Sequence, residues 1–141
     1  MSTLTFDTAG NLYGTTQLGG KDGQGTVFEL TSPSGSTWKE TRRHFFSNTS
    51  DGAFPIGGVV LDAAGNLWGT TLGHSSWGTV FKLTPDSNGD WTSSAFVFNG
   101  FDGAGPYAGL VLDAAGNLYG TTAIGGTGRG TGYGVVFEIV P

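Results

Sequence analysis

The sequence DAAGNLYGTT at residues 113–122 indicates the fold of this chain, because it occurs three times. Residues 62–71 repeat it with Trp68 in place of tyrosine, and residues 7–16 repeat it with Thr8 in place of alanine. A second phrase, of the type GTVFEL, follows each copy at residues 25–30, 78–83 and 134–139. The repeat length of about 50 residues is typical of propeller blades and other all-β arrays.

The composition favours a β-rich protein with many tight turns. Glycine accounts for 27 of the 141 residues, and charged residues account for only 12% of the chain. Apolar and aromatic residues recur in register, which a disordered chain would not need. The net charge of −5 argues against nucleic acid as a partner. No apolar run approaches the ~20 residues of a membrane span, and without cysteine the chain has no disulfides or thiolate chemistry.

Each repeat is expected to form four antiparallel strands, A to D. Strand A is predicted at residues 4–6, 59–61 and 110–112, where short aliphatic and β-branched runs precede the first phrase. Strand B is the Leu-Tyr/Trp-Gly-Thr-Thr segment that ends the first phrase. The glycine in this strand predicts the close approach of a backbone or aromatic ring. Strand C is Val-Phe-Glu/Lys-Leu, and strand D, at residues 38–46 and 91–98, is more polar and therefore predicted at the outer edge. No segment keeps the 3.6-residue period of a helix.

Repeating units of four strands predict an all-β fold of β-propeller blades, with nearly three blades in the chain. A β-solenoid would have shorter coils, and a β-sandwich would not demand repetition. We expect a single repeat domain over residues 1–141. Its divisions are blade 1 at about 4–58, blade 2 at about 59–109 and an incomplete blade 3 at about 110–141.

Fewer than three blades cannot close a ring alone, since propellers have about 4–8 blades. Either several copies assemble by rotation into a homo-oligomer, or the chain is part of a longer array. A dimer, with six blades, is favoured over a trimer with nine.

The combination of DAAGNLYGTT, then GTVFEL or GTVFKLTP, then FNGFDGAGPYAGLVLD at residues 98–113 resembles the bacterial tandem repeat called GloVer. That repeat occurs in the choice-of-anchor tandem repeat GloVer-containing proteins, and the resemblance covers essentially the whole chain. It implies a propeller-like array on secreted or surface-anchored proteins, hence an extracellular or cell-surface location. It brings no established catalytic residues.

The recurring aspartates are interpreted as turn formers. Asp7, Asp62 and Asp113 open D-x-x-G-N turns, where alanine occupies positions that a calcium loop would fill with oxygen ligands. Asp51 and Asp102 lie in the phrase DGA-x-P and are expected to cap the turn before the next strand A. No metal site is therefore predicted.

The two histidines do not suggest catalysis. His44, in strand D, is expected to be exposed, and His74 lies beside two serines in a variable loop. A Ser-His pair would also need an orienting acid and an oxyanion site, which nothing here supplies. We expect no enzyme activity and no cofactor.

Strand alternation places the variable B–C loops and the D–A loops at one end of the blades, where binding usually resides. Aromatic rings near polar groups would suit a sugar. The candidate ligand-binding residues are His74, Trp77, Asp102, Tyr107, Arg129 and Tyr133. The expected function is a non-enzymatic secreted or surface module for assembly or binding. The alternative is a glycan-binding, lectin-like propeller, and an enzyme is less favoured.

Overall fold

The computed structural model describes residues 2–32, 37–73 and 77–141, in which β-strands, turns and loops occur but no helix. The bounds of the strands are β1 (Thr5–Phe6), β2 (Leu12–Thr16), β3 (Thr26–Thr31), β4 (Lys39–Phe45), β5 (Pro55–Leu61), β6 (Leu67–Thr71), β7 (Thr79–Pro85), β8 (Trp91–Val97), β9 (Val111–Leu112), β10 (Leu118–Thr121) and β11 (Val136–Ile139).

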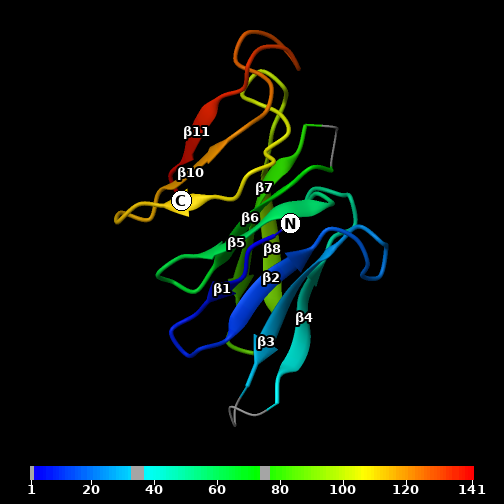
Figure 1. Cartoon of the computed structure of the whole chain (residues 1–141), viewed down its shortest axis with the longest axis vertical. Helices are drawn as coiled ribbons and strands as arrows, with labels where there is room; N and C mark the ends of the chain where they lie inside the picture. Colours follow the sequence, from blue (N-terminus) through cyan, green and yellow to red (C-terminus); the bar gives the residue numbers. More distant parts are fainter. Residues whose placement is uncertain (1, 33–36, 74–76) are drawn as a thin grey trace.

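These strands form three antiparallel sheets in which neighbours in sequence are neighbours in space. Sheet 1 contains β1 to β4, sheet 2 contains β5 to β8, and sheet 3 contains β9 to β11. Figure 1 shows the sheets following one another along the longest axis of the molecule. The predicted all-β fold and antiparallel strand order are confirmed. β5 begins at Pro55 rather than at Val59, because the DGA-x-P phrase runs directly into the strand through an irregular register.

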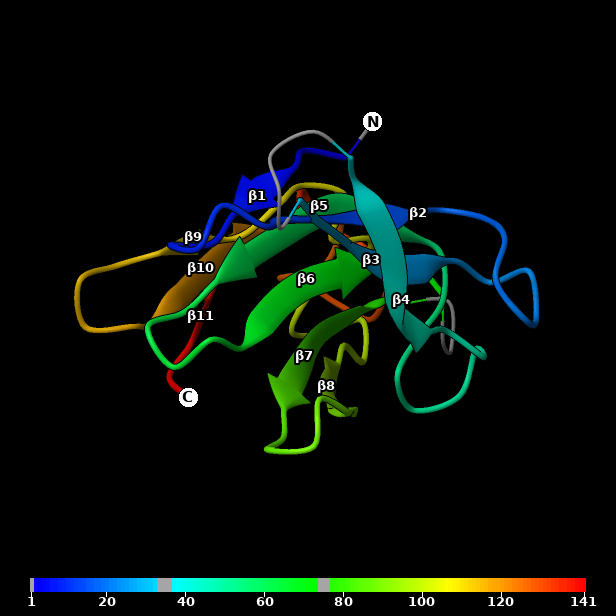
Figure 2. The same ribbon diagram turned by 90° about the horizontal axis from the view of Figure 1, so that it is seen from below.

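The turns and the loops lie at opposite ends of the sheets. Figure 2 shows the β1–β2, β5–β6 and β9–β10 turns on one side and the β2–β3 loop on the other. Strand alternation within each antiparallel sheet produces this separation. We call the side with the β2–β3, β6–β7 and β10–β11 loops the loop end.

Each sheet has two apolar faces. The side that carries Tyr13, Trp68 or Tyr119 is here called the forward face, and the side that carries the phenylalanine of β3, β7 or β11 is called the rear face. The forward face of sheet 1 packs on the rear face of sheet 2. The buried residues of this core are Tyr13, Val27, Phe46, Val59, Leu67, Phe81 and Leu83.

Sheets 2 and 3 repeat the same packing. Their shared core contains Trp68, Val80, Phe98, Leu110 and Leu118. In both interfaces a phenylalanine that follows the outer strand meets a phenylalanine of the next sheet edge to face. The ring centroids are 5.0 Å apart for Phe46 and Phe81 and 5.1 Å apart for Phe98 and Phe137. All of β6 is buried because sheet 2 is covered on both faces.

The glycine of strand B allows this packing, as the sequence predicted. A Cβ atom added to Gly69 would lie 2.6 Å from the Phe81 ring and 2.7 Å from the Gly58 carbonyl oxygen. The equivalent atom at Gly120 would lie 2.4 Å from Phe137. Each rear face therefore seats its phenylalanine ring in the space that a side chain would otherwise fill.

The segments that join strand D of one sheet to strand A of the next, here called the D–A connections, hydrogen-bond successive sheets to each other at the loop end. Phe54 N donates to the Gln24 carbonyl at 2.8 Å, and Gly73 N donates to the Ala53 carbonyl at 2.7 Å. The connection that follows sheet 1 therefore bonds to the B–C loops of both sheet 1 and sheet 2. A proline in each connection lies against the glycine before strand C of the preceding sheet, Pro55 against Gly25 and Pro106 against Gly78.

Candidate functional site

The D-x-x-G-N turns are held by their own aspartates. Asp7 Oδ1 accepts from the backbone NH groups of Ala9 at 2.9 Å and Asn11 at 2.8 Å, and its Oδ2 accepts from the Asn11 amide at 2.8 Å. Asp62 and Asp113 make the same three hydrogen bonds. The interpretation of these aspartates as turn formers is confirmed.

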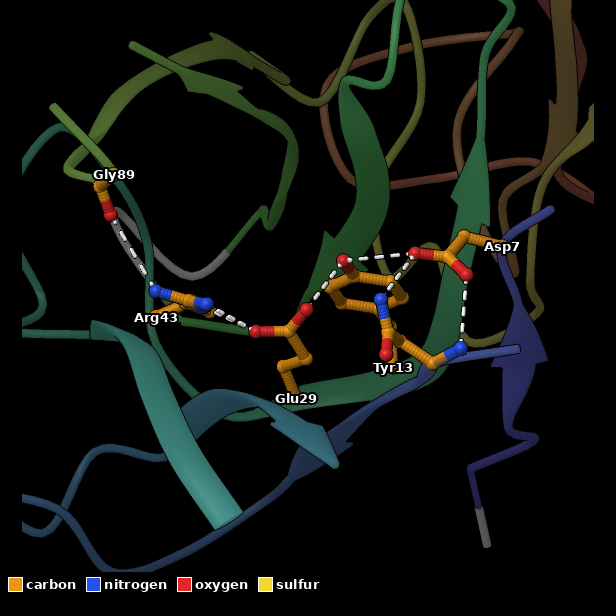
Figure 3. Close-up of polar contacts among 6 residues, drawn as sticks. Asp7, Tyr13, Glu29, Arg43 and Gly89 are labelled. Atoms are coloured by element: carbon orange, nitrogen blue, oxygen red, sulfur yellow. Dashed lines mark hydrogen bonds and ion pairs between the residues drawn. The ribbon is translucent and has the colours of Figure 1, made fainter. Parts of the chain in front are cut away.

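A polar network extends from the first of these turns between sheets 1 and 2 (Figure 3). The Tyr13 hydroxyl donates to Glu29 Oε1 at 2.7 Å, and Asp7 Oδ2 lies 3.4 Å from the same hydroxyl. Arg43 donates to the other Glu29 oxygen through Nε at 2.7 Å and through a terminal NH group. Its second terminal nitrogen reaches the Gly89 carbonyl of sheet 2 at 3.4 Å. The buried Glu29 carboxylate is thus paired with a cation and hydrogen-bonded on both oxygens.

A β-bulge aims Arg43 at this carboxylate. The pairing of β3 and β4 shifts between Val27 and Phe28, so Arg43 lies between the residues that pair with them. Bulges commonly redirect a side chain in this way. One part of the network could have been found from the sequence, because alternation along strands B and C allows Tyr13 to face Glu29, and the structure pairs these two residues. The sequence offered no signal for the bulge, and the network was therefore missed.

The network raises the pKa of Tyr13 and lowers the pKa of Asp7. Burial raises the pKa of the Tyr13 hydroxyl, and the hydrogen bond and charge of Glu29 raise it further. Burial alone would raise the pKa of Asp7, but the hydrogen bonds from Asn11, Ala9 and Tyr13 outweigh burial and hold the pKa below 3.8. Tyrosine stays neutral and aspartate stays charged, which is a structural arrangement rather than an acid–base pair poised near neutral pH.

The other sheets carry variants of the network. In sheet 2, Trp68 Nε1 donates to Asp62 at 2.9 Å, and Lys82 takes the position of Glu29 with its Nζ atom 4.9 Å from the centre of the indole ring. In sheet 3, Tyr119 donates to Glu138 at 2.8 Å and lies 3.2 Å from Asp113. The hydrogen bond with Glu138 is the main reason that the pKa of Tyr119 rises to about 12.

His44 is not exposed, contrary to the expectation from its arginine neighbours. Its Nε2 atom lies 2.9 Å from Asp51 Oδ2, and its ring packs edge to face on Phe46 with centroids 4.8 Å apart. The bulge that turns Arg43 toward Glu29 leaves His44 on the same side as Val27, facing sheet 2. Asp51 also accepts from the Thr49 hydroxyl at 2.9 Å, so it ties its own turn to strand β4.

Three of the predicted ligand-binding residues come together at the loop end. The Arg129 guanidinium lies 5.7 Å from the centre of the Trp77 ring, and Arg129 Nε donates to the Asn99 carbonyl at 3.2 Å. Asp102 accepts from the Asn99 backbone at 2.9 Å and from its amide at 2.8 Å, which confirms its role as a turn cap. Loops of sheets 2 and 3 thus meet around Asn99.

The remaining predicted residues do not join this cluster through any contact in the described parts of the chain. Tyr107 is exposed and lies beside Gly105, whose added Cβ would meet its ring at 2.8 Å. Tyr133 is fully exposed. His74 lies outside the described residues. Sequence reasoning did not select Asn99 as part of the cluster, because only the fold shows that it links Asp102 to Arg129.

The loop-end cluster combines aromatic rings with charged and polar groups. Trp77 is half-buried under Arg129, and Phe101 and Tyr107 expose aromatic rings nearby in sequence. Residues 2–32, 37–73 and 77–141 contain no group of three His, Cys, Asp or Glu side chains placed to hold a metal ion. Over the same residues, no helix is long and apolar enough to cross a membrane.

Comparison with known proteins identifies the repeat. No curated protein and no solved structure matches the chain significantly. The family model of the Gloeobacter/Verrucomicrobia repeat, or GloVer repeat, matches residues 1–141. The three D-x-x-G-N turns and the repeated sheet packing described above lie within this match. The chain therefore belongs to the Gloeobacter/Verrucomicrobia repeat family.

Proposed function

We propose that the chain is a run of β-propeller blades that serves as a non-enzymatic module for assembly or binding. The observation that carries this proposal is that both sheet interfaces use the same pair of faces, forward on rear. In a propeller, one sheet-to-sheet step is repeated around a central axis.

Close contacts between the first strands of successive sheets support a common axis. The Thr5 hydroxyl donates to the Val59 carbonyl, and a Cβ atom added to Gly57 would lie 2.8 Å from the Gly109 Cα atom. The innermost strands of propeller blades surround the central channel, and the largely exposed strands β4 and β8 suit the outer edge.

Solution scattering together with a mass measurement tests the blade arrangement. A curved arc or a ring of sheets about a central axis is expected. A straight stack of sheets would indicate a solenoid-like array and overturn the proposal.

We also propose that the module works outside the cell, on a secreted or surface-anchored protein. The GloVer resemblance supports this location. Fractionation and protease treatment of intact native cells test it. The module should be found in the culture fluid or on the cell surface, and protease added to intact cells should remove the surface fraction. A module found only inside the cells and fully protected from protease would overturn the proposal.

The alternative is a lectin-like module that binds carbohydrate at the loop end. It is favoured by the stacking of Arg129 on Trp77, since an aromatic ring beside hydrogen-bond donors suits a sugar ring. A glycan array probed with Arg129→Ala should lose the signals of the unmodified chain. Arg42→Ala, which removes another exposed arginine from β4, is the matched control. An array without signals above background would contradict the lectin alternative and leave the blade proposal standing.

A further inference from the structure

Equivalent residues of the three forward faces differ sharply in burial. Val27 is 0% exposed, Val80 is 1% exposed and Val136 is 78% exposed, although all three hold the same place in strand C. Likewise Glu29 is buried under sheet 2 whereas Glu138 is exposed. The forward face of sheet 3 is therefore one half of an interface that the chain forms twice elsewhere.

The rear face of sheet 1 is the other half. Val59 is 3% exposed and Leu110 is 5% exposed, whereas Leu4, at the same place in strand A, is 54% exposed. Phe6 is exposed beside it. Trp38 is also exposed, while its equivalent Trp91 is half-buried and packs on Tyr13 with ring centroids 6.3 Å apart.

We propose that the forward face of sheet 3 binds the rear face of sheet 1 of a second copy of this chain. This inference rests on the proposed propeller stacking and names its partner. The occupant is a second copy because the two open faces carry, in strands A to C, the residues equivalent to those that meet in the internal interfaces. Sheet 3 has three strands, so the new contact lacks the phenylalanine that follows the fourth strand in sheets 1 and 2. A groove of about 310 Å³ on sheet 3, lined by Val111, Tyr119 and Val136 among others, is the receiving surface.

The internal interfaces specify the new contacts. Tyr13 meets Trp91 within the chain, so Tyr119 of one copy meets Trp38 of the other. The Thr5 side chain reaches the backbone of Val59, so Val111 of one copy lies beside Leu4 of the other. The contact is heterologous, because different surfaces meet, and two such contacts related by rotation close a ring of two copies. Three sheets from each copy would give six blades, within the usual range of about 4–8.

The mass of single variants tests the two faces. The unmodified chain should show about twice the 14.5 kDa of one chain. Leu4→Asp and Val136→Asp each place a charge on one open face and should reduce the mass to that of a single chain. Leu18→Asp makes the same substitution at an exposed leucine of the β2–β3 loop and should leave the dimer intact.

Mixing the variants tests the head-to-tail geometry. The Leu4→Asp chain keeps an intact forward face, and the Val136→Asp chain keeps an intact rear face. In their mixture one contact joins two intact faces and the second contact carries both substitutions. The mixture should therefore recover a 1:1 dimer held by one contact, weaker than the unmodified dimer but stronger than either variant alone, which also shows that both variants are folded. If either variant fails to fold, as judged by circular dichroism, the mixing experiment is repeated with Trp38→Ala and Tyr119→Ala.

The possible outcomes separate this inference from the function on which it rests. An oligomer that survives both aspartate substitutions, or a mixture of folded variants that associates no more strongly than either variant alone, overturns the assigned faces and leaves the blade arrangement intact. An unmodified chain that stays a single chain at all concentrations overturns self-association. A scattering envelope without curvature overturns the blade arrangement itself.

Discussion

Tyr13 and Tyr119 show how one residue position acquires different properties in successive repeats. Both hydroxyls donate to the glutamate of strand C and lie near the aspartate of their own turn. Tyr13 is covered by sheet 2 and belongs to the core, whereas Tyr119 is only half-buried. The bonds come from the local sequence, and the burial comes from the neighbouring sheet.

Tyr119 is expected to titrate near pH 12, above the ordinary pKa of 10.0, because its hydroxyl donates to Glu138. Glu138→Gln should lower this pKa, since the hydrogen bond to a charged acceptor is lost. The absorbance of tyrosinate, with the signal of Tyr119→Phe subtracted, measures it in chains that carry Leu4→Asp, so that self-association does not cover Tyr119. The raised pKa means that the neutral phenol stabilises the fold fully below pH 10, and that this contribution is lost as pH rises through about 12. An unchanged titration in Glu138→Gln would contradict the assignment.

Arg43→Met is expected to destabilise the fold by about 3 kcal/mol, because it leaves the buried Glu29 carboxylate without its cation. The double variant Glu29→Gln/Arg43→Met should be more stable than Arg43→Met alone, since it no longer buries an unpaired charge. Urea unfolding gives the free energy of unfolding of the unmodified chain, the two single variants and the double variant, which together form a double-mutant cycle. In chains that also carry Leu4→Asp, so that self-association does not cover the rear face of sheet 1, Arg42→Met should change stability little, because Arg42 is exposed on that face. If Arg43→Met and Arg42→Met behaved alike, the ion pair would have no structural role.

At the scale of the element, the strand B glycine decides how closely a sheet and its phenylalanine can pack. The three copies have different surroundings. An added Cβ atom at Gly69 meets the Gly58 carbonyl as well as Phe81, whereas at Gly120 it meets only the side chains of Phe137 and Leu110 among the nearest atoms. A side chain can shift, but the backbone of a paired strand cannot shift without breaking its ladder.

Gly69→Ala is therefore expected to cost more stability than Gly120→Ala, and overpacking of a core typically costs about 1–3 kcal/mol. Thermal unfolding of the two variants gives the comparison. Adding Phe137→Leu to Gly120→Ala should restore part of the loss, and adding Phe81→Leu to Gly69→Ala should restore less. Equal losses and equal rescue would show that the Gly58 carbonyl is not the limiting contact.

The sequence predicted the elements well and their side-chain partners poorly, for a physical reason. The turns and strand order follow from local patterns that recur three times, such as Asp113 and its turn. The bulge at Val27 and Phe28 depends on the pairing of β3 with β4, which no local pattern records. That bulge buries His44 and directs Arg43 to Glu29, and both features were missed. At the loop end, strand alternation correctly placed Trp77 and Arg129 together, whereas Tyr133 is fully exposed.

For the whole molecule, sheet 2 is the centre of stability because both of its faces are covered. Every residue of β6 is buried, while β11 has alternating exposed and half-buried residues. Local opening is easiest where few apolar contacts hold an element. The three sheets of one chain therefore differ in stability although their sequences are similar.

Hydrogen exchange should be slowest in β6 and β7 and fastest in β9 and β11. The measurement is best made on the Val136→Asp chain, so that self-association does not protect sheet 3. Backbone amides of β2 and β3 are expected to show intermediate protection, because sheet 1 is covered on its forward face only. Uniform exchange across the three sheets would contradict this order.

The contact between each connection proline and the glycine before strand C has a consequence for evolution and for engineering. Pro55 on Gly25 and Pro106 on Gly78 fix the next sheet immediately beyond the points where the first two variable loops end. The loops at residues 17–24, 72–77 and 123–133 differ in length, yet the two sheet interfaces are alike. Loop content is thereby uncoupled from the geometry of stacking. A foreign peptide grafted into one loop would be displayed at a defined place on the scaffold, and the loops can change in length and sequence without a new backbone.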